Sequence, residues 1–256
     1  GAGRPRAPGG LRGLLRSRHV PRPRLPAARC PGRARGARGA GRLAAGWRGG
    51  TTRLDTLFED GCAKIRLPRT HDDSLQAVLI NSSGGLTGGD RIDWTIAAGP
   101  GARMVLTTQA CERVYRSLGP DAELSTRISV GDQARLDWLP QETILFEGGR
   151  LRRRLDADLT ATSVFTAVAT VTPPRRAVGG GAPHPRFPPS SPLPARRAPP
   201  HASGTLLTGA DLERNGLGLL EHNRAFATVL HIAPDAGRHL DAVRALLPAG
   251  AQAAAS

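Results

Sequence analysis

Cysteine, lysine and aromatic residues are scarce in this 256-residue chain, which has three cysteines, one lysine, one tyrosine and three tryptophans. Cys30, Cys62 and Cys111 form no CxxC pair and are odd in number, so we expect no disulfide framework and a reducing, cytoplasmic location. No run of about 18 apolar residues occurs, and no apolar segment of signal-peptide length follows the basic N-terminus. The sequence therefore predicts neither a membrane span nor a secretory signal.

Acidic residues are absent from residues 1–50, which carry 13 arginines, and from residues 172–204, which hold ten prolines and five arginines. Such Arg-, Gly-, Pro- and Ala-rich segments bury too little apolar area to offset the entropy cost of ordering them. We expect residues 1–45 to form a disordered basic arm and residues 172–204 a disordered Pro-rich insert. The folded core is expected at 46–171, with 205–256 as its truncated C-terminal part.

The basic arm leaves one alternative function open, which is binding of RNA or DNA by counterion release. No aromatic residue interleaves with the arginines of residues 1–45, and this disfavours nucleic acid as a partner. Deleting the arm should abolish salt-sensitive RNA retention if this alternative holds.

The core sequence predicts mainly β structure. Short segments that alternate apolar and polar residues recur every 10 to 14 residues, with Gly, Pro, Asp or Asn at most joints. This spacing favours an all-β architecture over βαβ units, which need helical segments between strands. The predicted strands are 63–67, 76–81, 91–97, 103–108, 113–117, 122–130, 134–139, 143–147, 151–159 and 164–171.

A weak internal repeat favours a stacked, solenoid-like version of this architecture. Residues 99–106 (GPGARMVL) are echoed 32 residues later by GDQARLDW, and a looser copy begins at TATSVFTAVAT. Repeats of this size usually bury their faces against neighbouring copies. With fewer than three good copies, a plain β-sandwich stays an alternative.

One helix is predicted near the end of the chain, at residues 235–247. Leu240, Val243 and Leu247 follow a helical spacing that gives the segment one apolar stripe. Asp235 is placed to cap the start of the helix, and Pro248 lies just past its end.

Enzyme signatures are missing. The glycine-rich GGLTGGD at 84–90 lacks the Lys-Ser/Thr pair of a phosphate-binding loop and runs between two predicted strands, so its glycines are expected to serve tight turns. The seven histidines form neither HxH nor HExxH, and no GxSxG occurs. A β-solenoid enzyme would need a carboxylate pair on one strand face, for which Asp137 and Glu142 are the nearest candidates.

A few residues remain as candidates for binding. Asp90 and Glu142 are carboxylates beside apolar strands, suited to weak metal or partner contacts. Cys111, next to Glu112, has no base at a known distance and is expected to be a free buried thiol. Tyr115, the single tyrosine, suits a recognition surface or an ordinary strand edge.

Four segments, in order and spacing, resemble the urease accessory protein D family, UreD or UreH. They are GGLTGGD at 84–90, GPGARMVLTT at 99–108, QACERVYRS at 109–117 and LDWLPQETILFEG at 136–148. The similarity runs from about residue 46 to 171 and resumes weakly at 206–247. The arm and the Pro-rich insert have no counterpart in the usual family pattern.

This resemblance implies a non-enzymatic maturation factor with no tightly bound cofactor. It implies binding to a UreF-type protein and through it to a UreG-type GTPase, docking on urease apoprotein, and help in delivering nickel, which some proposals route through an internal passage. Scattered oxygen ligands suit such a handover better than a closed His/Cys cage. By motif position, the expected transient nickel contacts are Asp90 and Glu142, and the expected passage or partner residues are Thr107, Thr108, Tyr115, Arg116 and Gln141.

Overall fold

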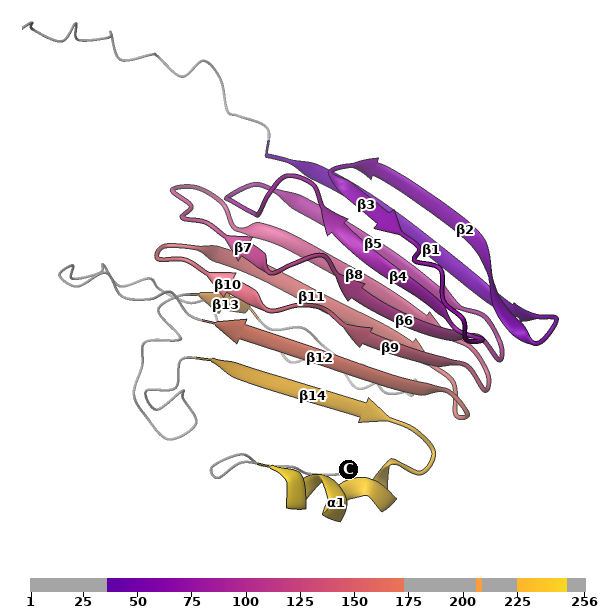
Figure 1. Cartoon of the computed structure of the whole chain (residues 1–256). Coiled ribbons are helices and arrows are strands. Elements are labelled where there is room, and N and C mark those ends of the chain that lie inside the picture. The colour runs from indigo at the N-terminus through magenta and orange to yellow at the C-terminus, as the bar shows by residue number, and fades with distance from the viewer. Residues whose placement is uncertain (1–35, 173–205, 209–224, 248–256) are drawn as a thin grey trace, which may run out of the picture. The chain divides into compact units, whose positions relative to one another are not determined.

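A computed structural model describes residues 36–172, 206–208 and 225–247 of the chain (Figure 1). The described residues all belong to one compact unit. The predicted Pro-rich insert and most of the predicted basic arm lie outside the described residues.

The described residues form two β-sheets and one short C-terminal helix, so the predicted mainly β fold is confirmed (Figure 1). Sheet A has the strand order β13-β11-β8-β5-β1-β2, and sheet B has the order β3-β4-β6-β9-β12-β10-β7, with β14 paired to β12. The strands are β1 (Arg38–Arg48), β2 (Thr51–Gly61), β3 (Ala63–Arg66), β4 (Leu75–Asn81), β5 (Arg91–Ala98), β6 (Arg103–Thr108), β7 (Glu112–Val114), β8 (Ala122–Val130), β9 (Arg135–Leu139), β10 (Thr143–Leu145), β11 (Arg150–Leu159), β12 (Val164–Thr172), β13 (Leu206–Thr208) and β14 (Phe226–Ile232).

The chain coils between the two sheets as a β-solenoid of about three turns. The chain passes from β4 in sheet B to β5 in sheet A and back to β6 in sheet B. It then runs to β8 in sheet A, β9 in sheet B, β11 in sheet A and β12 in sheet B. Neighbouring turns pair in parallel, through β5–β8 and β8–β11 in sheet A and through β4–β6, β6–β9 and β9–β12 in sheet B. A parallel coil of this kind lets each turn bury its apolar face against the next. The β-sandwich alternative was wrong because successive turns pair in parallel, whereas the sheets of a sandwich are antiparallel.

The predicted repeat sets the register of these turns. Met104 pairs with Leu136, which pairs with Phe165, and all three side chains are buried. The turn before each strand is tied to the next turn, as where the Gly101 N–H donates to the carbonyl of Asp132 at 2.9 Å. The 32-residue spacing read from the sequence is therefore the length of the turn from Met104 to Leu136, and the next turn, from Leu136 to Phe165, takes 29 residues.

Strand β1 corrects the predicted boundary of the basic arm, because residues 38–45 are strand and not disordered. Three of its four buried residues, Gly39, Gly41 and Ala45, are small, and they gave the segment its low-complexity appearance. A Cβ on Gly41 would lie 2.2 Å from the ring of Trp94. The glycine is therefore required by packing, so composition alone misjudged this strand.

The C-terminal helix is confirmed, although it begins later than predicted. A 3₁₀ turn at Ala236–His239 precedes α1 (Leu240–Leu246), and Asp235 makes no side-chain cap hydrogen bond. Its carboxylate lies 3.5 Å from His239 Nε2 instead. The cap predicted for Asp235 was wrong.

Candidate functional site

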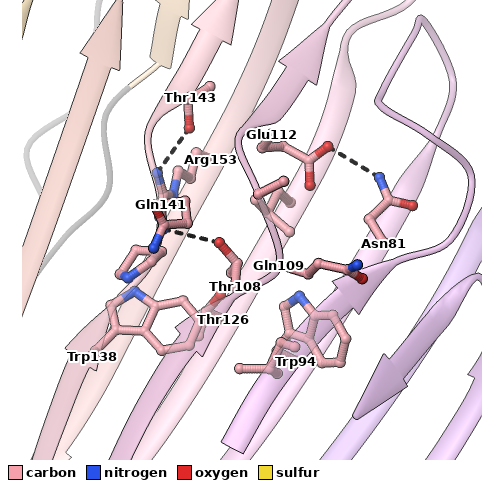
Figure 2. Close-up of a pocket in the computed structure, with 14 residues that line it drawn as sticks. Asn81, Trp94, Thr108, Gln109, Glu112, Thr126, Trp138, Gln141, Thr143 and Arg153 are labelled. Carbon is pink, nitrogen blue, oxygen red and sulfur yellow. Dashed lines mark hydrogen bonds between the residues drawn. The ribbon is translucent and has the colours of Figure 1, made fainter. Parts of the chain in front are cut away.

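A small chamber lies inside the coil, between sheet A and the end of sheet B that β10 and β7 form (Figure 2). Its volume is about 30 Å³, which is enough to hold a water molecule. Apolar groups line part of the chamber, Trp94 and Trp138 among them, and polar side chains line the rest (Figure 2). The lining residues are Leu79, Asn81, Trp94, Thr108, Gln109, Ala110, Glu112, Leu124, Thr126, Trp138, Pro140, Gln141, Thr143 and Arg153.

Successive turns of the coil place polar residues on β7 and β10, which are neighbouring strands of sheet B. Glu112 on β7 pairs in parallel with Thr143 on β10, so both side chains face the interior. The corner before β7 is sharp, and Ala110 there has a φ of 54°, in the left-handed region that non-glycine residues rarely adopt. A strained corner that lines a cavity is a common feature of functional sites.

Glu112 is the acidic residue of the chamber lining. Its Oε1 accepts a hydrogen bond from Asn81 Nδ2 at 3.1 Å (Figure 2). Burial raises the pKa of the Glu112 carboxyl, against the lowering effects of the Asn81 hydrogen bond and the Arg153 charge, while the charge of Asp90 raises it further. The chamber therefore disfavours an unneutralised carboxylate.

Arg153 on β11 faces Glu112 from sheet A (Figure 2). Its Nη1 donates to Thr143 Oγ1 at 3.3 Å. Burial lowers the pKa of the Arg153 guanidinium, and the Glu112 charge partly offsets this. The two charges attract each other across the chamber and are not held in a direct ion pair.

Two of the predicted passage residues lie at the chamber, Thr108 and Gln141. The Gln141 main-chain N–H donates to Thr108 Oγ1 at 3.0 Å. Thr107 is next to this pair, with its Oγ1 3.5 Å from Gln141 Nε2, but it does not line the chamber. The structure thus brings the three residues together from adjacent turns.

The two predicted metal contacts lie outside the lining. Both carboxylate oxygens of Asp90 accept main-chain N–H groups, from Ala37 at 2.6 Å and from Thr87 at 2.7 Å, and the residue is 5% exposed. Glu142 precedes Thr143 of β10 and is partly exposed, and its main-chain carbonyl accepts a hydrogen bond from the Glu112 N–H at 2.9 Å. Whether either carboxylate contacts a metal stays a prediction.

Tyr115 lies on the outer surface and stacks on Phe146, with ring centroids 5.2 Å apart and planes 13° apart. The two residues follow β7 and β10 on adjacent turns and are 41% and 39% exposed. Gly85 leaves room for the tyrosine ring, because a Cβ there would lie 2.5 Å from it. The Arg116 carbonyl accepts the Thr87 hydroxyl at 3.2 Å, which ties this surface to the glycine-rich loop.

Sequence reasoning missed Arg153, Asn81 and Phe146 and gave Glu112 no role of its own. One signal was available for Arg153. Leu151, Leu155, Ala157 and Leu159 alternate along β11, so the same alternation places Arg153 on the inner face. The positions of Asn81 and Phe146 relative to the site depend on the pitch of the coil, and two and a half sequence repeats are too few to predict that pitch.

No group of three His, Cys, Asp or Glu side chains that could hold a metal occurs among the described residues. The same part of the chain contains no helix long and apolar enough to cross a membrane. The chamber is small and is lined by both apolar and polar side chains.

Comparison with known proteins decides the family. The sequence profile described as UreD urease accessory protein matches residues 37–256. The chain belongs to the UreD urease accessory protein family. It is 51% identical over 220 residues to the urease accessory protein UreD of Chelativorans sp. strain BNC1, covering 86% of this chain and 79% of that protein. It is 46% identical over 219 residues to the UreD of Rhizobium rhizogenes, covering 82% and 78% of the two chains.

Membership of the UreD family fixes the general role. The chain is a non-catalytic accessory protein with a chaperone role in assembly of the urease nickel metallocentre. The predicted family and the predicted non-enzymatic function are thereby confirmed. The chamber and the Tyr115–Phe146 surface are the features of this chain from which a finer role can be argued.

Proposed function

We propose that this UreD-family chain binds a UreF-type accessory protein and through it a UreG-type GTPase, docks on urease apoprotein in the cytoplasm, and passes nickel through its internal chamber. The observation that supports this most is the chamber itself. It is large enough for one ion, lies inside the coil, and has oxygen-bearing side chains from several turns in its wall. An interior that served only as a core would be filled with apolar groups.

The chemistry of the lining suits transit better than storage. Carboxylate, hydroxyl and amide oxygens bind nickel more weakly than a set of imidazoles or thiolates. In the proposed path, Glu142 at the outer rim gives the first contact, Thr108 and Gln141 the next, and Glu112 the innermost. Asp90 acts through its charge, which reaches Glu112. Each contact is weak enough for nickel to leave again.

The Tyr115–Phe146 stack is the proposed anchor for the UreF-type partner. Both rings are partly exposed, and Leu118, three residues after Tyr115 in the chain, is 92% exposed. Aromatic side chains carry much of the binding energy in protein interfaces. Arg116, on the same loop, borders this surface.

Co-expression tests the partner assignment. The full chain is produced with a UreF-type protein, a UreG-type GTPase and urease apoprotein in a host without its own UreD. We expect the chain to co-purify with the UreF-type protein and urease to gain nickel, measured by metal analysis. Absence of both, from a chain whose circular dichroism shows the β-rich fold, would contradict the proposal.

Two substitutions test the path. Glu142→Gln and Glu112→Gln should lower the nickel content of urease while leaving co-purification with the UreF-type protein unchanged. Glu147→Gln, an exposed carboxylate in the neighbouring loop, is the matched control and should have no effect. Equal nickel loading in all three variants would exclude the chamber as the route.

A further inference from the structure

Arg153 is the single charged residue among the inward positions of β5, β8 and β11 in sheet A. The other inward positions of β5, β8 and β11 carry aliphatic residues, with the exceptions of Trp94 and Thr126, which are uncharged. Across these strands, Arg153 is in register with Leu124, which is in register with Ile92. A leucine at position 153 would continue the apolar row, so packing does not explain the arginine.

The energetics of this position are unfavourable by themselves. A guanidinium loses hydration on burial, and that loss is recovered only through good hydrogen bonds and a paired charge. Arg153 has one hydrogen bond, to a neutral hydroxyl at 3.3 Å, and faces the Glu112 carboxylate without a direct ion pair. Glu112 is held in turn by Asn81. A buried charge that is poorly satisfied for folding is a candidate for a functional role.

The position of this charge matters because the chamber has room for one ion. Together, Glu112 and Arg153 give the lining no net charge. A divalent cation that approaches Glu112 therefore meets a fixed positive charge inside the same small space, and repulsion between like charges is strong where water is excluded. The guanidinium thus occupies the electrostatic position that a free cation would take.

We infer that Arg153 is a tethered cation that competes with divalent metal ions for Glu112 and keeps the chamber closed to them until the arginine is displaced. This inference rests on the proposed function, since it concerns control of the proposed nickel path. It makes Glu112 the oxygen ligand of the innermost site and Arg153 its internal inhibitor.

Nickel binding to the purified full-length chain tests this directly, by competition of NiCl₂ with a chromophoric chelator. Arg153→Gln keeps a donor for Thr143 and removes the charge. Because removing one neighbouring charge changes a binding equilibrium by about tenfold per pKa unit of interaction, we expect Arg153→Gln to lower the nickel Kd by roughly tenfold or more. Arg153→Lys keeps the charge and should bind as the wild type does.

Two further variants complete the design. Arg154→Gln removes a neighbouring arginine that faces outward and pairs with Asp156 at 2.7 Å, so it should leave nickel affinity unchanged. The double variant Glu112→Gln/Arg153→Gln should lose the gain. An unchanged Kd in Arg153→Gln, or a gain that persists in the double variant, would overturn the inference.

Circular dichroism separates a loss of folding from a change in nickel binding. Arg153→Met is a second neutral variant with the same predicted gain, and whichever neutral variant keeps the wild-type circular dichroism spectrum decides the result. The nickel Kd is measured on the purified chain alone, independently of nickel loading into urease. Tighter nickel binding by the neutral variants, with no urease activation by the wild type, would reject only the proposed function. Activation by the wild type with unchanged Kd values would reject only the role of Arg153.

Discussion

The ring of Trp94 lies directly over the Cα of Gly41, leaving no room for a side chain on β1 at this point. An added Cβ would sit 2.2 Å from one ring atom and 2.4 Å from another. Trp94 is 4% exposed and also lines the chamber, so the contact holds β1 against a residue of the candidate site. Gly41 thereby couples β1, the strand beside the edge strand β2 of sheet A, to the chamber.

Gly41→Ala should destabilise the chain by about 1–3 kcal/mol, the usual cost of overpacking a well-filled core. Denaturant unfolding followed by tryptophan fluorescence measures this. Gly119→Ala is the control, because a Cβ there meets nothing within 4 Å. Combining Gly41→Ala with Trp94→Leu should recover part of the loss, and a full, additive loss in the double variant would show that the ring is not the cause.

A second prediction concerns Asp90, whose two oxygens accept the main-chain N–H groups of Ala37 and Thr87. Asp90→Asn turns one acceptor into a donor that faces another donor, and an unsatisfied buried group costs about 1–3 kcal/mol. The free energy of unfolding should fall by that amount. Asp93→Asn, on the exposed pair with Arg91, should change it by less than about 1 kcal/mol. Equal effects of the two substitutions would contradict the structural role of Asp90.

The parts of the fold that sequence predicted well are those in which local pattern and tertiary packing agree. The strands at 103–108 and 122–130 were predicted with their observed bounds, because apolar residues alternate and glycine- or proline-containing turns flank them. Strand β2 was missed because most of its residues are exposed on both faces, so no alternation marks it. Strand β1 was missed because contact with Trp94 demands small residues.

The candidate site was predicted only in part, for a related reason. Thr108 and Gln141 follow from motif position, and the structure brings them together at the rim. Glu112 and Arg153 meet from different walls of the coil, and only the pitch and direction of the turns bring them together. A partial repeat predicts stacking but not which inward positions share one chamber.

A third prediction concerns the stacked pair Tyr115 and Phe146. Aromatic pairs contribute about 0.5–1.5 kcal/mol beyond burial, so a double-mutant cycle of Tyr115→Ala and Phe146→Ala should give a coupling free energy in that range. Chemical unfolding of the four proteins supplies it. Leu118→Ala removes an exposed apolar side chain from the same loop and should leave stability unchanged. Additive effects of the two aromatic substitutions would mean that the rings do not interact.

The last prediction concerns the pH dependence of stability, and it follows from the buried carboxyl of Glu112. Burial raises the pKa of this group in the folded protein above the value of about 4.3 that an unfolded chain gives it. Between those two pKa values the folded state binds more protons than the unfolded state, so stability falls as pH rises through this window. The stabilising effect of the protonated form is complete below pH about 4 and is lost above the folded-state pKa.

Glu112→Gln keeps the acceptor for Asn81 and cannot ionise, so it should lack this loss. We expect the variant to be more stable than the wild type at pH 7 to 8, with the difference shrinking toward zero as the pH is lowered to about 4. Thermal unfolding of both proteins at half-unit pH steps gives the comparison. A variant that is less stable at neutral pH would show that attraction to Arg153 outweighs the cost of burial, and Glu112 would then act as a stabilising partner of the arginine.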